Sequence, residues 1–360
     1  MIKYLKSLLN KFTQATLGKK IITMVLMIVY IAMLFSVAIK VNIEVVTPGT
    51  LNRTAYTLSD TQEVGVIKIE TENKSGNIYT VGVYSHLRVS LFQYLISNFS
   101  KHISQKAYNP KLDLSNKEEI IRGEIHRDFS LIHALIVAYE EASKVNDTIH
   151  IEYEFKGLIV SAVLSYSKSG LVPGDYITHI NGVKIENLND FQNKLAAIYH
   201  DKAFTLTIIR NNETKTISAQ KVLHDEKYKL GFEASEYYII DREKTTPQFK
   251  ISEKMPSLGS SGGAMTALAI YNALLNEDIT KNKRITGTGT INISGEVGNI
   301  GGVQQKIVTA TMYNVEIFFV DSIDYNEAKT KYDEIHAGFQ LIPVATFADI
   351  IQALRGEGHE

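Results

Sequence analysis

The sequence predicts an α+β protein of several domains behind a single N-terminal transmembrane helix. Its 360 residues suffice for two or three domains, since a domain averages roughly 150 residues. A hydrophobic fraction of 44% and a charged fraction of 21% are typical of globular chains that bury a sizeable core. Alternating strand patterns and helical apolar patterns both recur along the body, and one uncharged stretch near the N-terminus is long enough to cross a bilayer.

The composition excludes several classes of function. Lys+Arg 38 against Asp+Glu 39 gives a net charge of −1, whereas proteins that coat nucleic acid are normally basic. Zero cysteines exclude disulfides, thiolate metal sites and a cysteine nucleophile. The ten histidines show no metal-binding spacing such as His-Glu-x-x-His. We therefore expect no nucleic-acid partner, no metal and no cofactor.

Residues 21–39 are an uncharged apolar run, predicted as a transmembrane signal-anchor helix. At 1.5 Å per residue, a helix of this length covers about 28 Å, close to the hydrocarbon thickness of a bilayer. Residues 1–20 form a basic tail, and no acidic residue occurs before Glu44. The positive-inside rule then predicts a cytoplasmic N-terminus and a body outside the cell after Lys40.

A cleavable signal peptide is the alternative interpretation of this run. Ser36-Val37-Ala38 resembles a small-x-small cleavage site. The apolar part of a signal peptide is normally about 7–15 residues long, which is shorter than the run observed here. We therefore favour a retained anchor, while release of the body by signal peptidase or by self-cleavage stays open.

Residues 42–150 are predicted to be an extracytoplasmic α/β spacer without chemistry of its own. Residues 65–70 and 77–84 alternate as strands, and residues 91–100 and 117–144 have helical patterns. In the second of these helices four apolar residues recur at helical spacing, namely Leu131, Leu135, Ile136 and Tyr139. We interpret this stripe as core.

The run Gly174-Asp175-Tyr176-Ile177-Thr178-His179-Ile180-Asn181-Gly182 fits the Gly-Asp-x-Ile-x-x-Ile-Asn-Gly signature of the PDZ family. Residues 151–222 therefore resemble a PDZ domain, a fold expected here as a small β-barrel or sandwich with helices. Asn181-Gly182 is also a type I′ turn dipeptide between apolar runs. The resemblance places a carboxylate-binding loop at four residues, Gly157, Leu158, Ile159 and Val160. It implies that a peptide adds there as an extra strand.

A serine-rich turn, Gly259-Ser260-Ser261-Gly262-Gly263, opens an apolar helix predicted over residues 264–275. A serine at a helix N-terminus lies among free N–H groups and at the positive end of the helix dipole. This position suits a nucleophile beside an oxyanion site as well as a helix cap. The turn alone leaves both interpretations open.

A second glycine-rich segment favours the nucleophile. Residues 286–291 lead to Gly295-Glu296-Val297-Gly298-Asn299-Ile300-Gly301-Gly302-Val303-Gln304-Gln305-Lys306, followed by a predicted helix over 307–313 and a strand over 315–321. Together with the serine turn, this segment resembles the proteolytic domain of the Lon family, here residues 223–355. The resemblance implies Ser261 as nucleophile, Lys306 as general base, and Thr288 and Gly262 as supporting residues.

Taken over most of its length, the chain resembles the bacterial membrane-anchored, PDZ-containing Lon-like serine proteases. Two positions depart from the Lon motif: Ser260 stands where the family has proline, and Gly262 stands where it has alanine. Ser260 and Ser257 are weaker candidates for the nucleophile. The resemblance also implies protein or peptide substrates and assembly into a homo-oligomer, a hexameric ring by analogy.

A lysine base requires desolvation, because an ammonium group with its ordinary pKa of about 10.4 cannot accept a proton at neutral pH. Lys306 is predicted on a helix with Ile307 and Val308, behind Ile300 and Val303, and such apolar surroundings lower a lysine pKa. The chain contains no Gly-x-x-x-x-Gly-Lys-Ser/Thr motif. We therefore expect an ATP-independent serine endopeptidase that acts at the outer face of the cytoplasmic membrane, with the PDZ-like module recruiting or gating substrates.

Two alternatives remain at this point. The sequence Gly259-x-Ser261-x-Gly263 also fits the nucleophile elbow of α/β-hydrolases, with His336 downstream as base and an acid from Asp321, Asp324 or Asp333. That fold requires a longer alternation of strands and helices than the segment offers. The other alternative is a catalytically silent, peptide-binding scaffold in which the serine turn has decayed.

Overall fold

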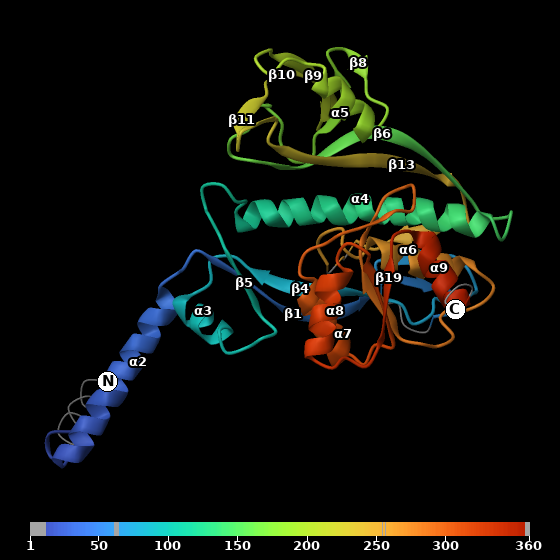
Figure 1. Ribbon diagram of the computed structural model, residues 1–360. Helices are drawn as coiled ribbons and strands as arrows, with labels where there is room; N and C mark the ends of the chain where they lie inside the picture. Colours follow the sequence, from blue (N-terminus) through green and yellow to red (C-terminus); the bar gives the residue numbers. More distant parts are fainter. Residues whose placement is uncertain (1–11, 61–64, 254, 256, 357–360) are drawn as a thin grey trace. The chain divides into compact units, whose positions relative to one another are not determined.

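The computed structural model describes residues 12–60, 65–253, 255 and 257–356. The chain divides into two compact units, which we describe separately. Figure 1 labels their helices and strands. One unit consists of Met1–Val46 and Ser85–Tyr108, and the other of Thr47–Tyr84 and Asn109–Glu360. Both helices and strands are present in each unit, which confirms the predicted α+β class.

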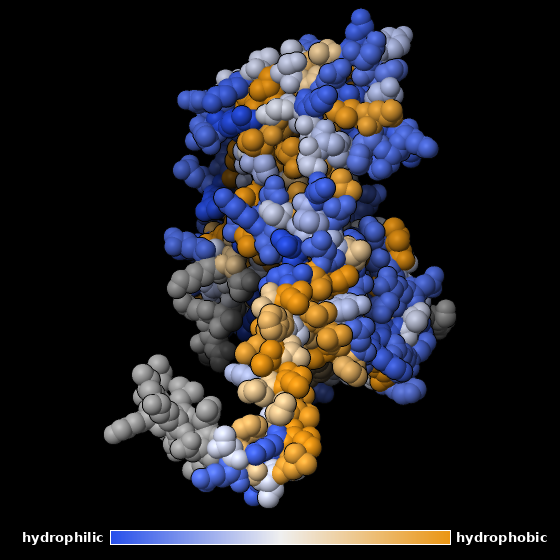
Figure 2. Space-filling model, turned by 90° about the vertical axis from the view of Figure 1, so that its left-hand side faces the viewer, coloured by the Kyte–Doolittle hydropathy of each residue, from blue (hydrophilic) through white to orange (hydrophobic). Residues whose placement is uncertain are grey.

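The first unit is built around the apolar helix α2 (Leu17–Ala38), none of whose residues is buried. Its length and composition are sufficient to cross a membrane. Figure 2 shows its apolar side chains as an orange column. A short helix, α3 (Leu91–Ser97), begins with a capping box between Ser90 and Gln93. The start of β1 (Ile43–Arg53) pairs antiparallel with β5 (Ser104–Ala107).

The second unit contains a parallel three-stranded sheet with helices on both faces. Its strand order is β15-β18-β19. The strands are β15 (Ile285–Thr288), β18 (Ile317–Asp321) and β19 (Gln340–Val344). The helices are α4 (Asn116–Ser143), α6 (Gly263–Leu274), α7 (Val303–Met312), α8 (Tyr325–Glu334) and α9 (Phe347–Arg355).

Side-chain alternation along β18 divides this region into two hydrophobic cores. Ile317 and Phe319 join the core formed with α4, α6 and α9, whereas Phe318 and Val320 join a second core with α7 and α8. All twelve residues of α6 are buried. The predicted helix over 264–275 and strand over 315–321 are thereby confirmed as α6 and β18.

Smaller strands close the edges of the second unit. Strands β2 and β3 of the sheet β14-β3-β2 contact α6, and β4 pairs with β1. These strands are β2 (Ala55–Thr57), β3 (Ile67–Ile69), β4 (Tyr79–His86) and β14 (Phe249–Ile251). Two further pairs are β11 (Val222–His224) with β12 (Lys227–Lys229), and β16 (Thr290–Ile291) with β17 (Val297–Gly298).

The segment predicted as a spacer is divided between the two units. Residues 85–108, with α3 and β5, belong to the first unit. The predicted helix over 117–144 is confirmed as α4, whose Leu135 and Ile136 lie fully buried against α6 in the second unit. Residues 109–150 therefore supply part of the core that supports the serine turn.

Residues 150–246 contain an open antiparallel sheet of order β10-β9-β7-β6-β13, with β8 paired to β7. The sheet is not closed into the barrel or sandwich that the sequence predicted, because β10 and β13 stand at opposite ends of it. Its elements are β6 (His150–Val163), β7 (Tyr176–Ile180), β8 (Val183–Lys184), α5 (Leu188–Ala196), β9 (Phe204–Arg210), β10 (Glu213–Ala219) and β13 (Phe232–Thr246).

The long antiparallel ribbon of β6 and β13 is shared by two cores. Leu158 and Val160 of β6 pack in the core of the open sheet, whereas Ile151 packs with α4 and α6. Phe155, at the middle of β6, packs against both cores. Figure 1 shows α4 running along this ribbon, and α4 contacts both of its strands. The ribbon therefore joins the open sheet to the helical part without an intervening linker.

Candidate active site

The serine turn is fixed by the start of α6 and by helix α4. Gly259 adopts a φ of +85°, a left-handed conformation that favours glycine, and its N–H donates to the Gly123 carbonyl at 2.8 Å. The Ser130 hydroxyl donates to the Ser260 carbonyl at 3.2 Å. A Cβ atom on Gly263 would lie 2.7 Å from the Ser130 hydroxyl oxygen, so α4 and the turn are in close contact. These contacts define where Ser261 lies.

Lys306 lies on α7 and is only 2% exposed. Its neighbours Val303 and Ile307 are part of the core that α7 forms with β18. Burial lowers the pKa of Lys306 to about 7, and the nearby Asp324 carboxylate partly opposes this shift. Burial thus favours the neutral amine at Lys306 far more than at an exposed lysine.

Thr288 connects Lys306 to the backbone of Ser261. The Lys306 Nζ donates to Thr288 Oγ1 at 2.8 Å, and the Thr288 hydroxyl donates to the Ser261 carbonyl at 3.1 Å. The Gly289 N–H donates to the same carbonyl at 2.9 Å. Because the single hydroxyl proton of Thr288 points to Ser261, Thr288 can only accept from Lys306. When the Lys306 amine is neutral, its lone pair therefore accepts no hydrogen bond from Thr288.

Three polar groups of the serine turn are unpaired within the described residues. The Ser261 hydroxyl has no hydrogen-bond partner among them, and neither do the N–H groups of Ser261 and Gly262. Ser261 is half-buried and lies directly before α6, whose N-terminus carries partial positive charge. The turn thus carries a hydroxyl and two N–H groups that no described residue engages.

Gly262, where the Lon motif has alanine, is explained by a neighbour on β4. A Cβ atom on Gly262 would lie 2.8 Å from Cγ2 and 3.2 Å from Cβ of Thr80. Its φ of −95° is accessible to any residue, so the constraint is steric and not conformational. The methyl group of Thr80 occupies the space that an alanine side chain would take.

The groups required by the α/β-hydrolase alternative are not assembled. His336 is exposed in the turn after α8, and within the described residues its ring makes no hydrogen bond or ion pair. Asp333 pairs with Lys329, and Asp324 accepts the Ile300 N–H at 2.8 Å. Asp321 is buried, and burial raises its pKa. No histidine is oriented by an acid beside Ser261 in this part of the chain.

The residues predicted as the carboxylate-binding loop lie in an inner strand. Gly157 to Val160 are in the middle of β6, where Leu158 pairs with Ile177 of β7 on one side and with Glu236 of β13 on the other. A peptide adds to a sheet only at an unpaired edge. The residues chosen from sequence therefore have no free edge to offer.

The edge strand that the sequence analysis missed is the first half of β13. It follows Leu230 and Gly231, and Gly231 has a φ of +70°. Lys229-Leu230-Gly231-Phe232 is nearer to the Gly-Leu-Gly-Phe pattern than residues 157–160 are, and this signal could have identified it. Helix α5 faces this strand: the Phe191 and Phe232 ring centroids lie 6.3 Å apart, and the Leu188 N–H donates to Glu236 at 2.7 Å.

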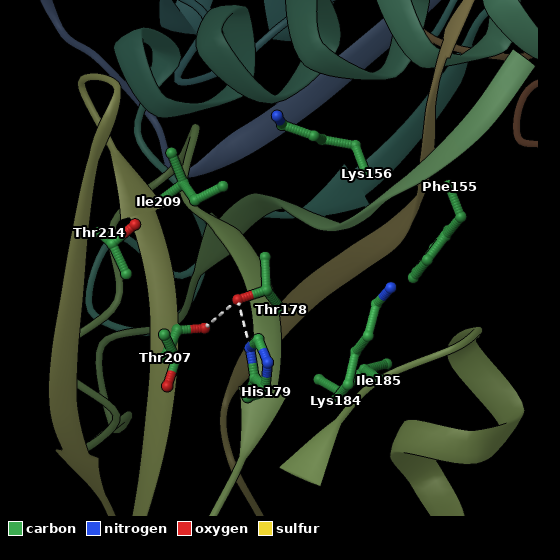
Figure 3. Close-up of a pocket in the computed structure, with 9 residues that line it drawn as sticks. All are labelled: Phe155, Lys156, Thr178, His179, Lys184, Ile185, Thr207, Ile209 and Thr214. Carbon is green, nitrogen blue, oxygen red and sulfur yellow. Dashed lines mark hydrogen bonds between the residues drawn. The ribbon is translucent and has the colours of Figure 1, made fainter. Parts of the chain in front are cut away.

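A separate hollow of about 290 Å³ lies on the open sheet (Figure 3). It is lined by Phe155, Lys156, Thr178, His179, Lys184, Ile185, Thr207, Ile209 and Thr214. Thr178 donates to the Thr207 carbonyl at 3.2 Å, and the His179 ring lies 2.9 Å from the Thr178 hydroxyl. None of the residues around Ser261 lines this hollow.

Comparison with known protein families agrees with this architecture. Residues 145–220 match the model of the PDZ domain, and residues 236–355 match that of the Lon protease (S16) C-terminal proteolytic domain. The chain therefore contains a PDZ domain and a proteolytic domain of the Lon type, a class of serine peptidase. Ser261, Thr288 and Lys306 all lie within the second match.

Individual relatives carry the name Lon protease. The chain is 31% identical to the Lon protease of Mesomycoplasma hyopneumoniae (strain 232) over 31% of this chain and 13% of that protein. It is 29% identical to the archaeal Lon protease of Methanothermobacter thermautotrophicus over 28% of this chain and 16% of the relative. With the Lon protease of Mycoplasma mobile it shares 21% identity over 73% of this chain and 29% of the relative. The matched region thus spans less than a third of each of these relatives.

The contact between Gly262 and Thr80 predicts how the serine turn tolerates substitution. Gly262→Ala should slow the labelling of Ser261 by a fluorophosphonate by on the order of 100-fold, because a displaced turn misplaces the hydroxyl by up to about 1 Å. Thr80→Ser removes the clashing methyl group but keeps the hydroxyl that donates to the Asn52 carbonyl. The double variant Thr80→Ser/Gly262→Ala should therefore recover most of the labelling rate. Equal rates for Gly262→Ala and wild type, or no recovery in the double variant, would refute this account.

Proposed function

We propose that this protein is a membrane-anchored serine endopeptidase that hydrolyses peptide bonds of proteins without ATP. Its nucleophile is Ser261 and its general base is Lys306. The observation that carries the proposal is the buried Lys306 amine, with its pKa near 7, joined through Thr288 to the backbone of Ser261. A buried lysine beside a serine at a helix N-terminus combines an activated nucleophile with oxyanion donors.

The chemistry follows from these positions. The neutral Lys306 amine takes the proton of the Ser261 hydroxyl while Oγ attacks the carbonyl carbon of the substrate. The oxyanion that forms accepts from the N–H groups of Ser261 and Gly262. Lys306 then gives its proton to the leaving amine as the C–N bond breaks, which leaves an acyl ester on Ser261. A water molecule, deprotonated by the same amine, hydrolyses the ester and restores the serine.

We place the protein in the cytoplasmic membrane through α2, with its body outside. The uncharged part of α2 is preceded by Lys19 and Lys20, and residues 1–20 contain no acid. Positive charge on this flank favours a cytoplasmic N-terminus. Substrates would then be proteins at or near the outer face of the membrane. Without a nucleotide-driven unfolding step, the enzyme would act on flexible or unfolded segments.

We assign substrate recruitment to the edge of β13 in the PDZ domain. The first half of β13 ends the open sheet, and α5 lies beside it with Phe191 near Phe232. A peptide added along Phe232–Ser235 would have backbone partners on β13 and apolar contacts from α5. Because β13 continues into the core next to α6, such a peptide would be held on the strand that leads to the proteolytic domain.

The dyad predicts a specific pattern of loss. Full-length wild type, Ser261→Ala, Lys306→Met and Ser260→Ala are compared in nanodiscs for cleavage of β-casein, an unfolded substrate, without nucleotide. Removing either member of the dyad should lower the rate by at least about 1,000-fold. Lys306→Met keeps a long side chain in the core, and Ser260→Ala should cleave at close to the wild-type rate, since only the Ser260 carbonyl is used in the turn.

Two results would contradict the dyad. Activity that survives Lys306→Met would mean that another group is the base. A wild-type protein that neither cleaves nor reacts with a fluorophosphonate would instead support the silent scaffold.

The lowered pKa of Lys306 predicts the pH dependence of the reaction. The base must be neutral, so kcat/KM should rise with pH and reach half its plateau at about pH 7. The Asp324 carboxylate raises the pKa of Lys306, so Asp324→Asn should move the half-plateau to lower pH. Rates of cleavage of a fluorogenic peptide between pH 5.5 and 9.5 would check both shifts. A half-plateau near the ordinary lysine pKa would show that Lys306 is not desolvated in the working enzyme.

The recruitment site can be located by photocrosslinking. A decapeptide with a C-terminal leucine and a benzoylphenylalanine two residues before it is irradiated with the Ser261→Ala protein. Cross-links are expected in residues 230–237 and 188–196, and an amidated peptide should give fewer of them because its carboxylate is missing. Cross-links confined to residues 157–160 and their neighbours on β7 would contradict this proposal and support the binding loop predicted from the sequence.

A further inference from the structure

We propose that α3 and the turn after it lie in the interfacial layer of the membrane, as a second point of attachment beside α2. This inference rests on the proposed anchoring by α2. The surface of α3 then contacts the headgroups and the upper acyl region of the bilayer.

One face of α3 is apolar and exposed. Leu95 is 48% exposed, Ile96 is 49% exposed and Phe99 is 89% exposed. Phe99 follows Leu95 by four positions and Ile96 by three, and its N–H donates to the Ile96 carbonyl at 3.0 Å, so the helical turn continues to it. These three side chains therefore share a face. On the other side of the helix Ser97 is buried, so the orientation of α3 in its unit is fixed.

The position of α3 along the chain's path puts this face at the membrane boundary. Helix α2 ends at Ala38, and the Leu91 N–H donates to the Ile39 carbonyl at 2.8 Å. The Val41 N–H donates to the Val89 carbonyl at 2.9 Å, and a bridge joins Lys40 to Ser90. A 22-residue helix spans about 33 Å, slightly more than the hydrocarbon layer. The first residue of α3 is thus tied to the point where the span leaves the hydrocarbon.

The charge of this unit matches an anionic lipid surface. Residues 85–108 contain Arg88, Lys101 and Lys106 but no Asp or Glu. Within residues 1–46, Glu44 is the sole acidic residue, and it accepts a hydrogen bond from the Ser85 hydroxyl at 2.6 Å. Basic residues beside an apolar, aromatic face are the composition of segments that lie in the membrane interface. A protein partner with an acidic surface is the competing occupant, and the experiment separates the two.

The absence of tryptophan from the sequence makes the test direct. Single-tryptophan variants of the full chain are reconstituted in vesicles of phosphatidylglycerol and phosphatidylcholine, with lipids brominated at shallow or deep acyl positions as quenchers. Phe99→Trp should show blue-shifted emission and at least twofold quenching by the shallow bromines. Because Phe99 is 89% exposed, the replacement does not disturb internal packing.

Two control positions make every outcome decisive. Tyr30→Trp, in the middle of α2, reports the span through deep bromines, and Tyr199→Trp, 75% exposed in the PDZ domain, should not be quenched. Quenching at position 30 without quenching at position 99 overturns the inference and leaves the anchor intact. Blue-shifted but unquenched emission at position 99 means that protein covers α3, which also overturns it. Loss of quenching at both positions refutes the anchor itself.

Discussion

The burial of one amine, that of Lys306, is the constraint on which the arrangement around Ser261 depends. A charged ammonium group is disfavoured in an apolar core, so this lysine is held with its pKa near 7 by the packing of α7 against β18. Such packing requires a rigid sheet and well-filled cores on both of its faces. The hydroxyl of Thr288 is the polar group that accompanies the amine into this interior, and it also fixes the carbonyl of Ser261. One buried threonine thus contacts both residues of the proposed dyad.

Helix α4 holds the proteolytic and PDZ regions together. On one side its Gly123 carbonyl and Ser130 hydroxyl hold the serine turn. On the other side Arg122 donates to Glu233 of β13 at 2.6 Å, and the His133 ring lies 3.0 Å from the Glu236 carbonyl. The edge strand β13 and the serine turn are therefore both held by nearby residues of one helix. A long helix with a continuous buried face keeps two such segments at a fixed separation.

The sequence was sufficient for the parts of the fold that are encoded locally. Apolar periodicity predicted α4 and α6 to within one or two residues, and the family motifs led to Ser261 and Lys306. Local patterns did not reveal β13 as the edge strand, because the pairing of β6 with a strand about 80 residues later depends on the whole sheet. They also could not explain Gly262, since its neighbour Thr80 lies far away in sequence. Contacts between distant segments decided both cases.

The ribbon of β6 and β13 is shared by the PDZ and proteolytic domains, which limits where the chain can be divided. The PDZ match ends at residue 220, and the match to the proteolytic domain begins at residue 236. These bounds suggest that a cut between them would yield two separate domains. Yet β13 starts in one module as its edge strand and ends in the other as part of its core. A recombination break or an expression boundary in this interval would strip the PDZ domain of its outer strand. A transfer that keeps both domains intact must therefore carry the whole ribbon, residues 150–246, together with the proteolytic domain.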